Sequence, residues 1–313
     1  MRRKKIIICH PYCNDGGPLV LSVLCKLLNE KGYQSYLFYY PWEPWKGSST
    51  IRFWFDWIKE TLKYLYFKYI NTDPKTKEYK KYVYNPISGL KRILIPFFST
   101  RNTIVLYPER IYGNPLKARN VIRYFLFHNP FKDDSTAFGR NDLFITYREV
   151  FNDWKLNPKC NKVTLYYFNK DLYKQYNFGQ RKENCYLIRK GRSRSDLPKT
   201  FDGPVIDYNT NEEDIVRIFN EYKYCFFYDT QTFYTNIAAV CGCLPICILE
   251  PGKTKSDYLK KDDIIFGVAY GNTKEEIEYA KSTRNQLLNE LDYTIQNEDN
   301  INKFIQLINE KFI

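Results

Sequence analysis

The fold is decided by residues 5–40, which read KIIICHPYCNDGGPLVLSVLCKLLNEKGYQSYLFYY. Residues 6–9 form a short apolar run typical of a buried strand, and a loop with paired glycines follows. Apolar residues then recur at helical spacing over 20–28, and 35–40 form a second apolar run. A strand, a glycine loop, a helix and a strand make the βαβ unit of a parallel, doubly wound sheet.

The same alternation continues through all 313 residues, a length that suggests two domains. Segment 152–162, rich in Asn, is predicted to be a hinge. Strands are predicted at 103–107, 143–147, 163–168, 186–189, 205–207, 225–228 and 245–249. Helices are predicted at 51–70, 117–127, 211–221, 232–241, 273–291 and 301–312. We therefore expect an α/β fold with domains at 1–155 and 163–298 and a closing helix at 299–313.

The formal charge of +13 is placed unevenly. Residues 1–150 hold 25 basic and 12 acidic residues, whereas 151–313 hold 23 of each. A basic half indicates an anionic partner, such as a phosphate, a nucleic acid or a membrane surface. Helix 51–70 adds a wide aromatic face beside a narrow charged stripe, which suits packing on its own domain or an interfacial position on a membrane.

The nine cysteines form no disulfide or metal framework. Several stand inside apolar runs, as Cys9, Cys225 and Cys247 do, which is typical of reduced thiols used as small apolar residues. No stretch approaches the ~20 apolar residues of a membrane span. We expect a cytoplasmic protein that needs no cofactor or metal, with contact to the cytoplasmic face of the inner membrane as a further hypothesis.

Polar groups follow several predicted strands, where open α/β sheets bind ligands. Candidate catalytic residues are His10, Asp15 and Glu109, because each falls at an expected strand end and can accept a proton. Arg189 and Lys190 precede Gly191 at another strand end, a pattern suited to a diphosphate. A solvated basic loop is the plain alternative for these two cations.

Residues 229–245 resemble the signature of GT-B glycosyltransferases of the E-x7-E group. The group's small-residue turn is similar to Cys241-Gly242-Cys243-Leu244-Pro245, and its first acid falls on Asp229. Its second acid position holds Ile237. Segments 107–109, 113–116, 120–123 and 267–271 resemble bacterial capsule and O-antigen glycosyltransferases.

This resemblance implies two Rossmann-like domains whose parallel sheets face each other across a cleft. The N-terminal domain, with its aromatic and basic segment 51–100, would hold a lipid-linked glycan acceptor of surface polysaccharide synthesis. The C-terminal domain would hold a nucleotide sugar without a metal. The implied acceptor residues are Asn14 and Asn114. The implied donor residues are Gly16, Gly17, Arg189, Lys190, Asp229, Thr230, Thr232, Phe233, Tyr234 and Thr235.

Other functions remain open at this point. A metal-dependent GT-A transferase would show a D-x-D motif, which the sequence lacks. A non-catalytic protein that binds nucleic acid or an anionic membrane would also use a basic, aromatic first half. Nucleic acid is the less favoured partner, because no helix-turn-helix, zinc-finger or RNP signature is present. A sugar-nucleotide epimerase would share the two Rossmann-like domains.

Overall fold

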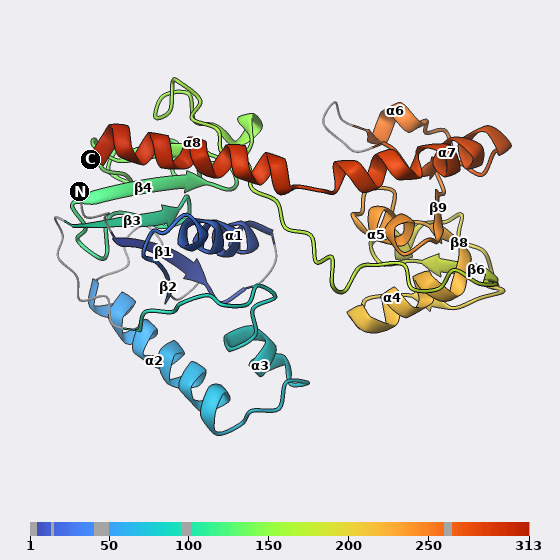
Figure 1. The fold of residues 1–313 in the computed structure, drawn as a ribbon, viewed down its shortest axis with the longest axis horizontal. Helices are drawn as coiled ribbons and strands as arrows, with labels where there is room; N and C mark the ends of the chain where they lie inside the picture. The colour runs from blue at the N-terminus through green and yellow to red at the C-terminus, as the bar shows by residue number, and fades with distance from the viewer. Residues whose placement is uncertain (1–4, 14–15, 41–49, 95–101, 260–264, 313) are drawn as a thin grey trace. The chain divides into compact units, whose positions relative to one another are not determined.

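The computed structural model describes residues 5–13, 16–40, 50–94, 102–259 and 265–312 (Figure 1). The chain divides into two compact units: unit 1 is Met1–Tyr167 with Thr294–Ile313, and unit 2 is Phe168–Tyr293. The segment predicted to be a hinge, 152–162, therefore lies inside unit 1. The chain also returns to unit 1 for its last helix, whereas the predicted C-terminal domain ran to 298.

Unit 1 contains a five-stranded, wholly parallel sheet in the order β2-β1-β3-β4-β5. Its strands are β1 (Lys5–Pro11), β2 (Ser35–Tyr40), β3 (Thr103–Pro108), β4 (Asn120–Phe125) and β5 (Leu143–Thr146). The chain order reverses between β1 and β3, as in other doubly wound sheets. Such sheets bind ligands at this switch point, outside the carboxyl ends of the strands.

Helices cover both faces of this sheet (Figure 1). Helices α1 (Gly16–Glu30) and α8 (Thr294–Phe312) share a core with Ile6 and Ile8 of β1. Helix α2 (Thr50–Tyr69) packs through Phe53 on the other face, with Ile7 and Cys9. The alternation along β1 follows from the two-residue period of a strand. Helix α3 (Lys77–Tyr82) lies beside α2.

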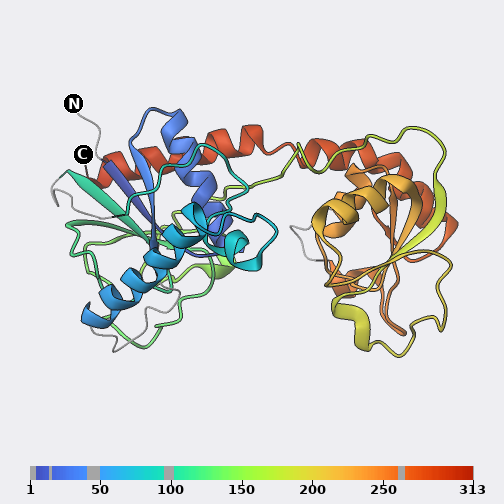
Figure 2. The ribbon, with the colours of Figure 1, turned by 90° about the horizontal axis from the view of Figure 1, so that it is seen from below.

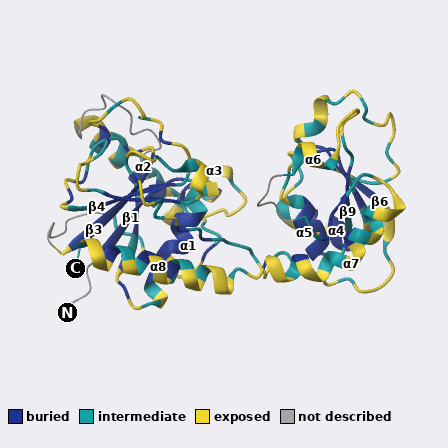
Figure 3. Cartoon of the chain, turned by 90° about the horizontal axis from the view of Figure 1, so that it is seen from above, coloured by how far each residue is buried: buried dark blue, intermediate teal, exposed yellow. Residues whose placement is uncertain are grey.

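The prediction of a helix at 117–127 is wrong, because this segment contains strand β4. Val121, Ile122, Tyr124 and Phe125 are all buried, as the dark blue of β4 in Figure 3 shows, and β4 pairs with β3 and β5. A central parallel strand is covered on both faces, so the residues of β4 are buried one after another, without a period of two. Such a run is ambiguous between helix and strand.

Arg123 is the fully buried charge in the middle of β4. Its Nε donates to Asp142 Oδ2 at 2.7 Å, its Nη1 donates to the Ile111 carbonyl at 2.8 Å, and its Nη2 donates to the Gly113 carbonyl. A buried guanidinium requires such partners, because an unpaired charge in the core is strongly destabilising. Arg123 therefore fixes the loops that follow β3 and precede β5.

The strand predicted at 163–168 is also absent from the described sheets, although the chain is close to β5 through an isolated bridge at Lys162. Helix α8 supplies the missing acceptors instead. The Thr164 N–H donates to Asn300 Oδ1, and the Tyr166 N–H donates to Asn297 Oδ1, both at 2.8 Å. The Val163 N–H still donates to the Thr146 carbonyl of β5 at 3.0 Å, and beyond it the extended chain obtains these hydrogen bonds from asparagines on α8.

Unit 2 repeats the topology of unit 1 with a second parallel sheet, ordered β10-β9-β8-β6-β7. Its strands are β6 (Lys182–Leu187), β7 (Val205–Ile206), β8 (Tyr222–Phe227), β9 (Leu244–Cys247) and β10 (Ala269–Tyr270). Counted from the first strand of each unit, the two orders are identical. The switch point of unit 2 therefore lies between β6 and β8.

The helices of unit 2 are α4 (Glu212–Glu221), α5 (Tyr234–Val240), α6 (Lys255–Tyr258) and α7 (Lys274–Glu290). The predicted helices near 211–221, 232–241 and 273–291 are confirmed, whereas α6 and β10 were not predicted. Short 3-10 turns occur at Glu149–Phe151 and Lys190–Ser193. All nine cysteines are free thiols and seven are buried, which confirms their use as small apolar residues.

Candidate functional site

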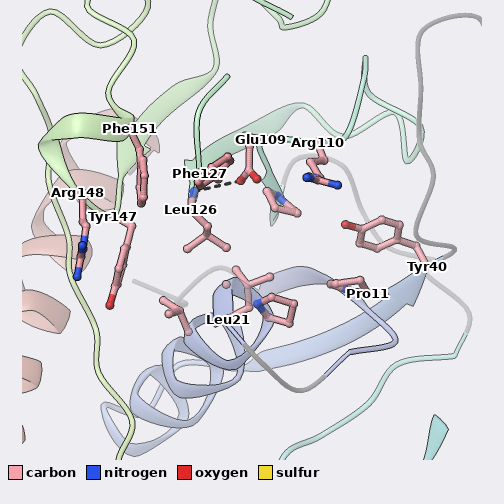
Figure 4. Close-up of a pocket in the computed structure, with 15 residues that line it drawn as sticks. Pro11, Leu21, Tyr40, Glu109, Arg110, Leu126, Phe127, Tyr147, Arg148 and Phe151 are labelled. Atoms are coloured by element: carbon pink, nitrogen blue, oxygen red, sulfur yellow. Dashed lines mark hydrogen bonds between the residues drawn. The ribbon is translucent and has the colours of Figure 1, made fainter. Parts of the chain in front are cut away.

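A cavity of about 430 Å³ opens at the switch point of unit 1 (Figure 4). In Figure 4, Tyr147 and Arg148 lie at one end, Tyr40 and Arg110 at the other, and Glu109 between them. Only Glu109, Arg110 and Arg148 carry charge among the lining residues. The full lining is Pro11, Gly16, Gly17, Pro18, Val20, Leu21, Tyr40, Pro108, Glu109, Arg110, Leu126, Phe127, Tyr147, Arg148 and Phe151.

Among the described residues that line this cavity, Glu109 is the one carboxylate, and it follows β3 directly. It is only 5% exposed, and its Oε2 accepts the backbone N–H of Leu126 at 3.0 Å. Burial raises the pKa of Glu109, and the backbone amides of Glu109, Leu126 and Phe127 with the Arg110 charge offset that rise only in part. A carboxylate with a raised pKa is a better proton acceptor near neutral pH.

Gly16 and Gly17 form the wall opposite Leu126, at the start of α1. Gly16 has a φ of +53°, a conformation that L side chains rarely adopt. A Cβ on Gly17 would lie 3.1 Å from the Cβ and Cδ1 of Leu126. The second glycine thus allows α1 to approach the loop after β4. The neighbouring predicted residues, Asn14 and Asp15, lie outside the described part of the chain.

Sequence reasoning named Gly16, Gly17 and Glu109 of the cavity lining and missed the others, among them Arg110, Tyr147, Arg148 and Phe151. Tyr147 and Arg148 directly follow β5, so the rule that ligand groups follow strand ends would have found them. Burial raises the pKa of Tyr147 to about 12, so its hydroxyl is neutral and can donate a hydrogen bond. Leu126 and Phe127 were not predicted as site residues, because segment 117–127 was expected to be a helix and not a strand that ends at Phe125.

His10 does not line the cavity, although a role as base was expected. Its ring is fully buried, with Nδ1 2.6 Å from the Pro11 carbonyl and Nε2 3.0 Å from Ser22 Oγ and 2.8 Å from the Pro18 carbonyl. Burial lowers the pKa of His10 to about 4, which keeps the ring neutral. These contacts give His10, near the end of β1, a structural role in joining β1 to α1.

Asn114, expected to contact the acceptor, has its amide engaged within its own loop. Its Oδ1 accepts from the Tyr107 hydroxyl at 2.9 Å and from the Ala118 N–H at 3.0 Å. Its Nδ2 donates to the Ala118 carbonyl at 2.8 Å. Asn114 thereby shapes the chain between β3 and β4.

In unit 2, the carboxylate of Asp229 organises the loop after β6. Asp229 is 4% exposed and accepts three consecutive backbone N–H groups. Arg189 and Gly191 donate to its Oδ1 at 3.0 and 2.8 Å, and Lys190 donates to its Oδ2 at 2.9 Å. The expected donor-binding acid and the expected cations are therefore brought together, with Asp229 holding the backbone that carries the cations.

Gly191 allows this loop to pack against the end of β8. A Cβ at this position would lie 2.3 Å from the Tyr228 carbonyl oxygen, closer than atoms can approach. The Arg189 guanidinium lies 4.9 Å from the ring centre of Tyr208 and 5.0 Å from that of Tyr234. Its Nε is buried and has no hydrogen-bond partner among the described residues, while Lys190 is exposed.

The other expected donor residues follow Asp229 in the turn before and within α5. The Tyr234 hydroxyl donates to Glu212 Oε2 at 2.9 Å, and the buried Thr235 hydroxyl donates to the Thr232 carbonyl at 2.9 Å. Phe233 is exposed, and Thr230 and Thr232 are half-buried. Tyr234 is thus the member of this set that contacts the basic loop, through Arg189.

No group of three or more His, Cys, Asp or Glu that could hold a metal ion occurs among the described residues. Over the same residues, no helix is long and apolar enough to cross a bilayer. The absence of a metal requirement stays a prediction.

No protein-family model and no curated protein sequence matches this chain. Solved structures with a similar chain path include an alpha-glucosyltransferase in complex with UDP-glucose and DNA containing an abasic site. It is 10% identical, covers 99% of this chain and 96% of its own, and has a TM-score of 0.33. An alpha-glucosyltransferase in complex with UDP and a 13-mer DNA is 12% identical, with the same coverage and a TM-score of 0.28. Likeness at this level does not assign an activity.

Proposed function

We propose that this protein is a glycosyltransferase that moves a sugar from a nucleotide-sugar donor to an acceptor hydroxyl. The observation that carries the proposal is the basic loop at the switch point of unit 2. There, Asp229 fixes the backbone of Arg189 and Lys190 beside the rings of Tyr208 and Tyr234. Cations beside aromatic rings at this edge of a doubly wound sheet suit a nucleoside diphosphate.

The donor diphosphate would contact Arg189 and Lys190, which stabilise the negative charge that develops on the leaving group. Arg can bind two phosphate oxygens at once, whereas Lys acts as a point charge. These residues would take the role that a divalent metal has in other transferases. Asp229 acts indirectly in this proposal, because its oxygens are already bonded to the loop.

The acceptor would occupy the cavity of unit 1, with its hydroxyl at Glu109. In the transfer, the bond between the anomeric carbon and the diphosphate oxygen breaks, and the electron pair leaves with the diphosphate. The acceptor oxygen bonds to the anomeric carbon, and its proton passes to Glu109. This role follows from the burial and raised pKa of Glu109 within the cavity.

The finer proposal is a lipid-linked glycan acceptor in the synthesis of a bacterial capsule or O-antigen. The lining of the cavity supports it, since a mostly apolar wall with Arg110 at one end and Arg148 at the other suits an acceptor with apolar and anionic parts. The sequence resemblance of 107–109, 113–116 and 120–123 to such transferases supports it independently.

A thermal-shift screen against UDP-, GDP-, CMP- and dTDP-sugars tests the donor. One of them should raise the melting temperature of the wild-type chain, because a ligand at 100 times its Kd stabilises by about 2.7 kcal/mol. The double variant Arg189→Ala/Lys190→Ala should respond less, while the variant Lys199→Ala, an exposed cation elsewhere in unit 2, should respond as the wild type. A chain that none of the four classes stabilises would contradict the proposal.

A second assay follows the transferred sugar itself. With the donor found above, a labelled sugar should move to lipid-linked acceptors extracted from bacterial membranes. Double-stranded DNA and acceptor-free buffer serve as comparison arms. Label that enters DNA would refute the lipid-linked acceptor but keep the transferase, and an epimerised donor without transfer would refute both.

A further inference from the structure

Helix α2 carries its apolar residues on two opposite faces. Its inner face is buried through Phe53 and Tyr64 against unit 1. Its outer face shows a second apolar row, which we call the outer stripe: Ile51, Phe55, Ile58, Leu62, Tyr66 and Tyr69. Spacings of four, three, four, four and three residues place this row along one side of the helix.

A surface helix normally presents charged or polar side chains to water, whereas the outer stripe presents apolar ones. Its six side chains are between 46% and 83% exposed, and none of them is charged. In Figure 2, α2 lies in front of the sheet and no described element of unit 1 passes over it. A contiguous exposed apolar row of this kind marks an interaction surface.

Charged residues border the outer stripe rather than interrupt it. Arg52, Lys59 and Lys63 follow one edge, by their positions on a 3.6-residue helix, and Lys68 lies on the other side. The acids of α2 are paired locally, since Asp56 lies 3.7 Å from Arg52 and Glu60 lies 2.8 Å from Lys63. Positive charge therefore dominates the border.

The surroundings of α2 extend this positive charge. Residues 50–94 hold ten Lys and Arg against four Asp and Glu, a net charge of +6. Lys75, Lys77, Lys80 and Lys81, on and before α3, are all exposed. An apolar row within a basic border matches the chemistry of an anionic lipid surface, where acyl chains lie beneath negative headgroups.

The helix is held firmly enough to present the row. Arg92 places its guanidinium 3.5 Å from the ring centre of Tyr64 and 4.3 Å from that of Tyr39, which joins α2 to β2. The Tyr82 hydroxyl of α3 donates to Glu60 at 2.6 Å. These contacts all use the inner face or the edge of α2, so they leave the outer stripe uncovered.

We propose that the outer stripe of α2 binds the surface of a membrane rich in anionic lipids. The helix would lie in the headgroup region, with the stripe toward the acyl chains and the lysines toward the phosphates. A second copy of the chain fits less well, because pairing two outer stripes would bring two borders of net positive charge together. The proposal is independent of the donor, since vesicle binding needs no nucleotide sugar.

Vesicle flotation tests the proposal on the full chain. Wild-type protein is mixed with phosphatidylcholine vesicles, alone or containing phosphatidylglycerol, at low and at high salt. We expect binding to the anionic vesicles, weakened at high salt because surface charge is screened. The double variant Phe55→Glu/Leu62→Glu should bind at least about tenfold more weakly, since two outer-stripe residues would become acidic.

Phe178→Glu is the matched control, because Phe178 is a highly exposed aromatic residue in unit 2. It should bind vesicles as the wild type does. Equal melting temperatures of the three proteins would show that the changes act at the surface. The lysine variant Lys59→Ser/Lys68→Ser keeps the apolar row and should lose the preference for anionic vesicles.

Three results would overturn the proposal. The first is vesicle binding that the acidic double variant retains in full. The second is a wild-type chain that ignores anionic vesicles but forms a dimer that the acidic variant does not form, which would assign the stripe to a second copy. The third is binding to double-stranded DNA, but not to vesicles, that the lysine variant loses.

Discussion

The two units place an acid at the same point of the same topology and use it differently. Glu109 follows β3 and Asp229 follows β8, each the third strand of its unit, and both are at most 5% exposed. Asp229 accepts three backbone N–H groups from residues 189–191. Glu109 borders a cavity, and its Oε2 accepts the Leu126 N–H at 3.0 Å, with the backbone amides of Glu109 and Phe127 also close to its carboxylate. Asp229 thus organises the protein loop around it, whereas Glu109 retains the capacity to accept a hydrogen bond from a ligand.

The difference arises in the loop after the first strand of each unit. In unit 2, residues 189–191 close over Asp229, and Gly191 packs directly against the Tyr228 carbonyl. In unit 1, Gly16 and Gly17 at the start of α1 line the cavity instead. The same topology therefore carries a basic loop packed on an acid in unit 2 and a cavity lined by an acid in unit 1. A few loop residues account for this difference.

The largest effect that tests this contrast is expected from Glu109→Gln. If Glu109 takes the acceptor proton, transfer should fall about 1000-fold, since general bases contribute 100- to 10,000-fold. Donor binding, measured by thermal shift, should not change, because the donor is assigned to unit 2. A variant with unimpaired transfer would leave Glu109 as another structural acid.

The stability of Glu109→Gln relative to the wild type should depend on pH. Burial raises the folded-state pKa of Glu109 above its ordinary value of 4.5, so its ionised form destabilises the fold. Glu109→Gln should therefore melt higher than wild type above the raised pKa, and the two should converge as pH falls below 4.5, where the wild-type carboxyl becomes protonated in both states. A Gln variant that melts lower at every pH would contradict this sign.

Asp229→Ala should instead act on the fold first. It leaves three backbone N–H groups without their acceptor, and we expect a loss of about 3 kcal/mol in the free energy of unfolding. Denaturant titration would measure it. Asp229→Asn keeps one acceptor oxygen and should lose about half as much. Donor binding should weaken only as far as the loop 189–191 loses its structure. A variant that stays fully stable but binds no donor would instead show that Asp229 contacts the donor directly.

The sequence predicted this arrangement in part. Strand ends and glycine loops located Gly16, Gly17, Glu109, Arg189 and Lys190, because the βαβ pattern has a regular sequence period and its ligand groups follow the strands. The same logic could not separate Glu109 from Asp229. Both are acids after a buried strand, and their difference lies in backbone hydrogen bonds that no local pattern encodes.

The errors have specific physical causes. Strand β4 was predicted as a helix because a strand buried on both faces has no alternation. Segment 163–168 was predicted as a strand because its partners, Asn297 and Asn300, lie more than 130 residues away on α8. His10 was expected to follow the first strand and face a ligand, but it lies within β1 and its ring is buried against Ser22.

A pair of glycine substitutions compares the two loops directly. Gly191→Ala places a Cβ 2.3 Å from the Tyr228 carbonyl oxygen and should lower stability by about 2 kcal/mol. Gly17→Ala meets only the Leu126 side chain, at 3.1 Å, and should cost about 1 kcal/mol. Thermal melts would rank them. Equal losses would mean that the cavity wall of unit 1 is as rigid as the filled loop of unit 2.

The smallest effect is expected from Arg189→Lys. Charge is kept, but the planar guanidinium beside Tyr208 and Tyr234 is lost, and with it the two-point contact to phosphate. We expect donor affinity to fall about fivefold, or about 1 kcal/mol, with little change in melting temperature. Arg192→Lys is the control, since Arg192 is exposed and its guanidinium lies 5.7 Å from the Tyr208 ring. If both variants lose the same affinity, the loop contributes only net charge, and the specific geometry around Asp229 has no role in recognising the donor.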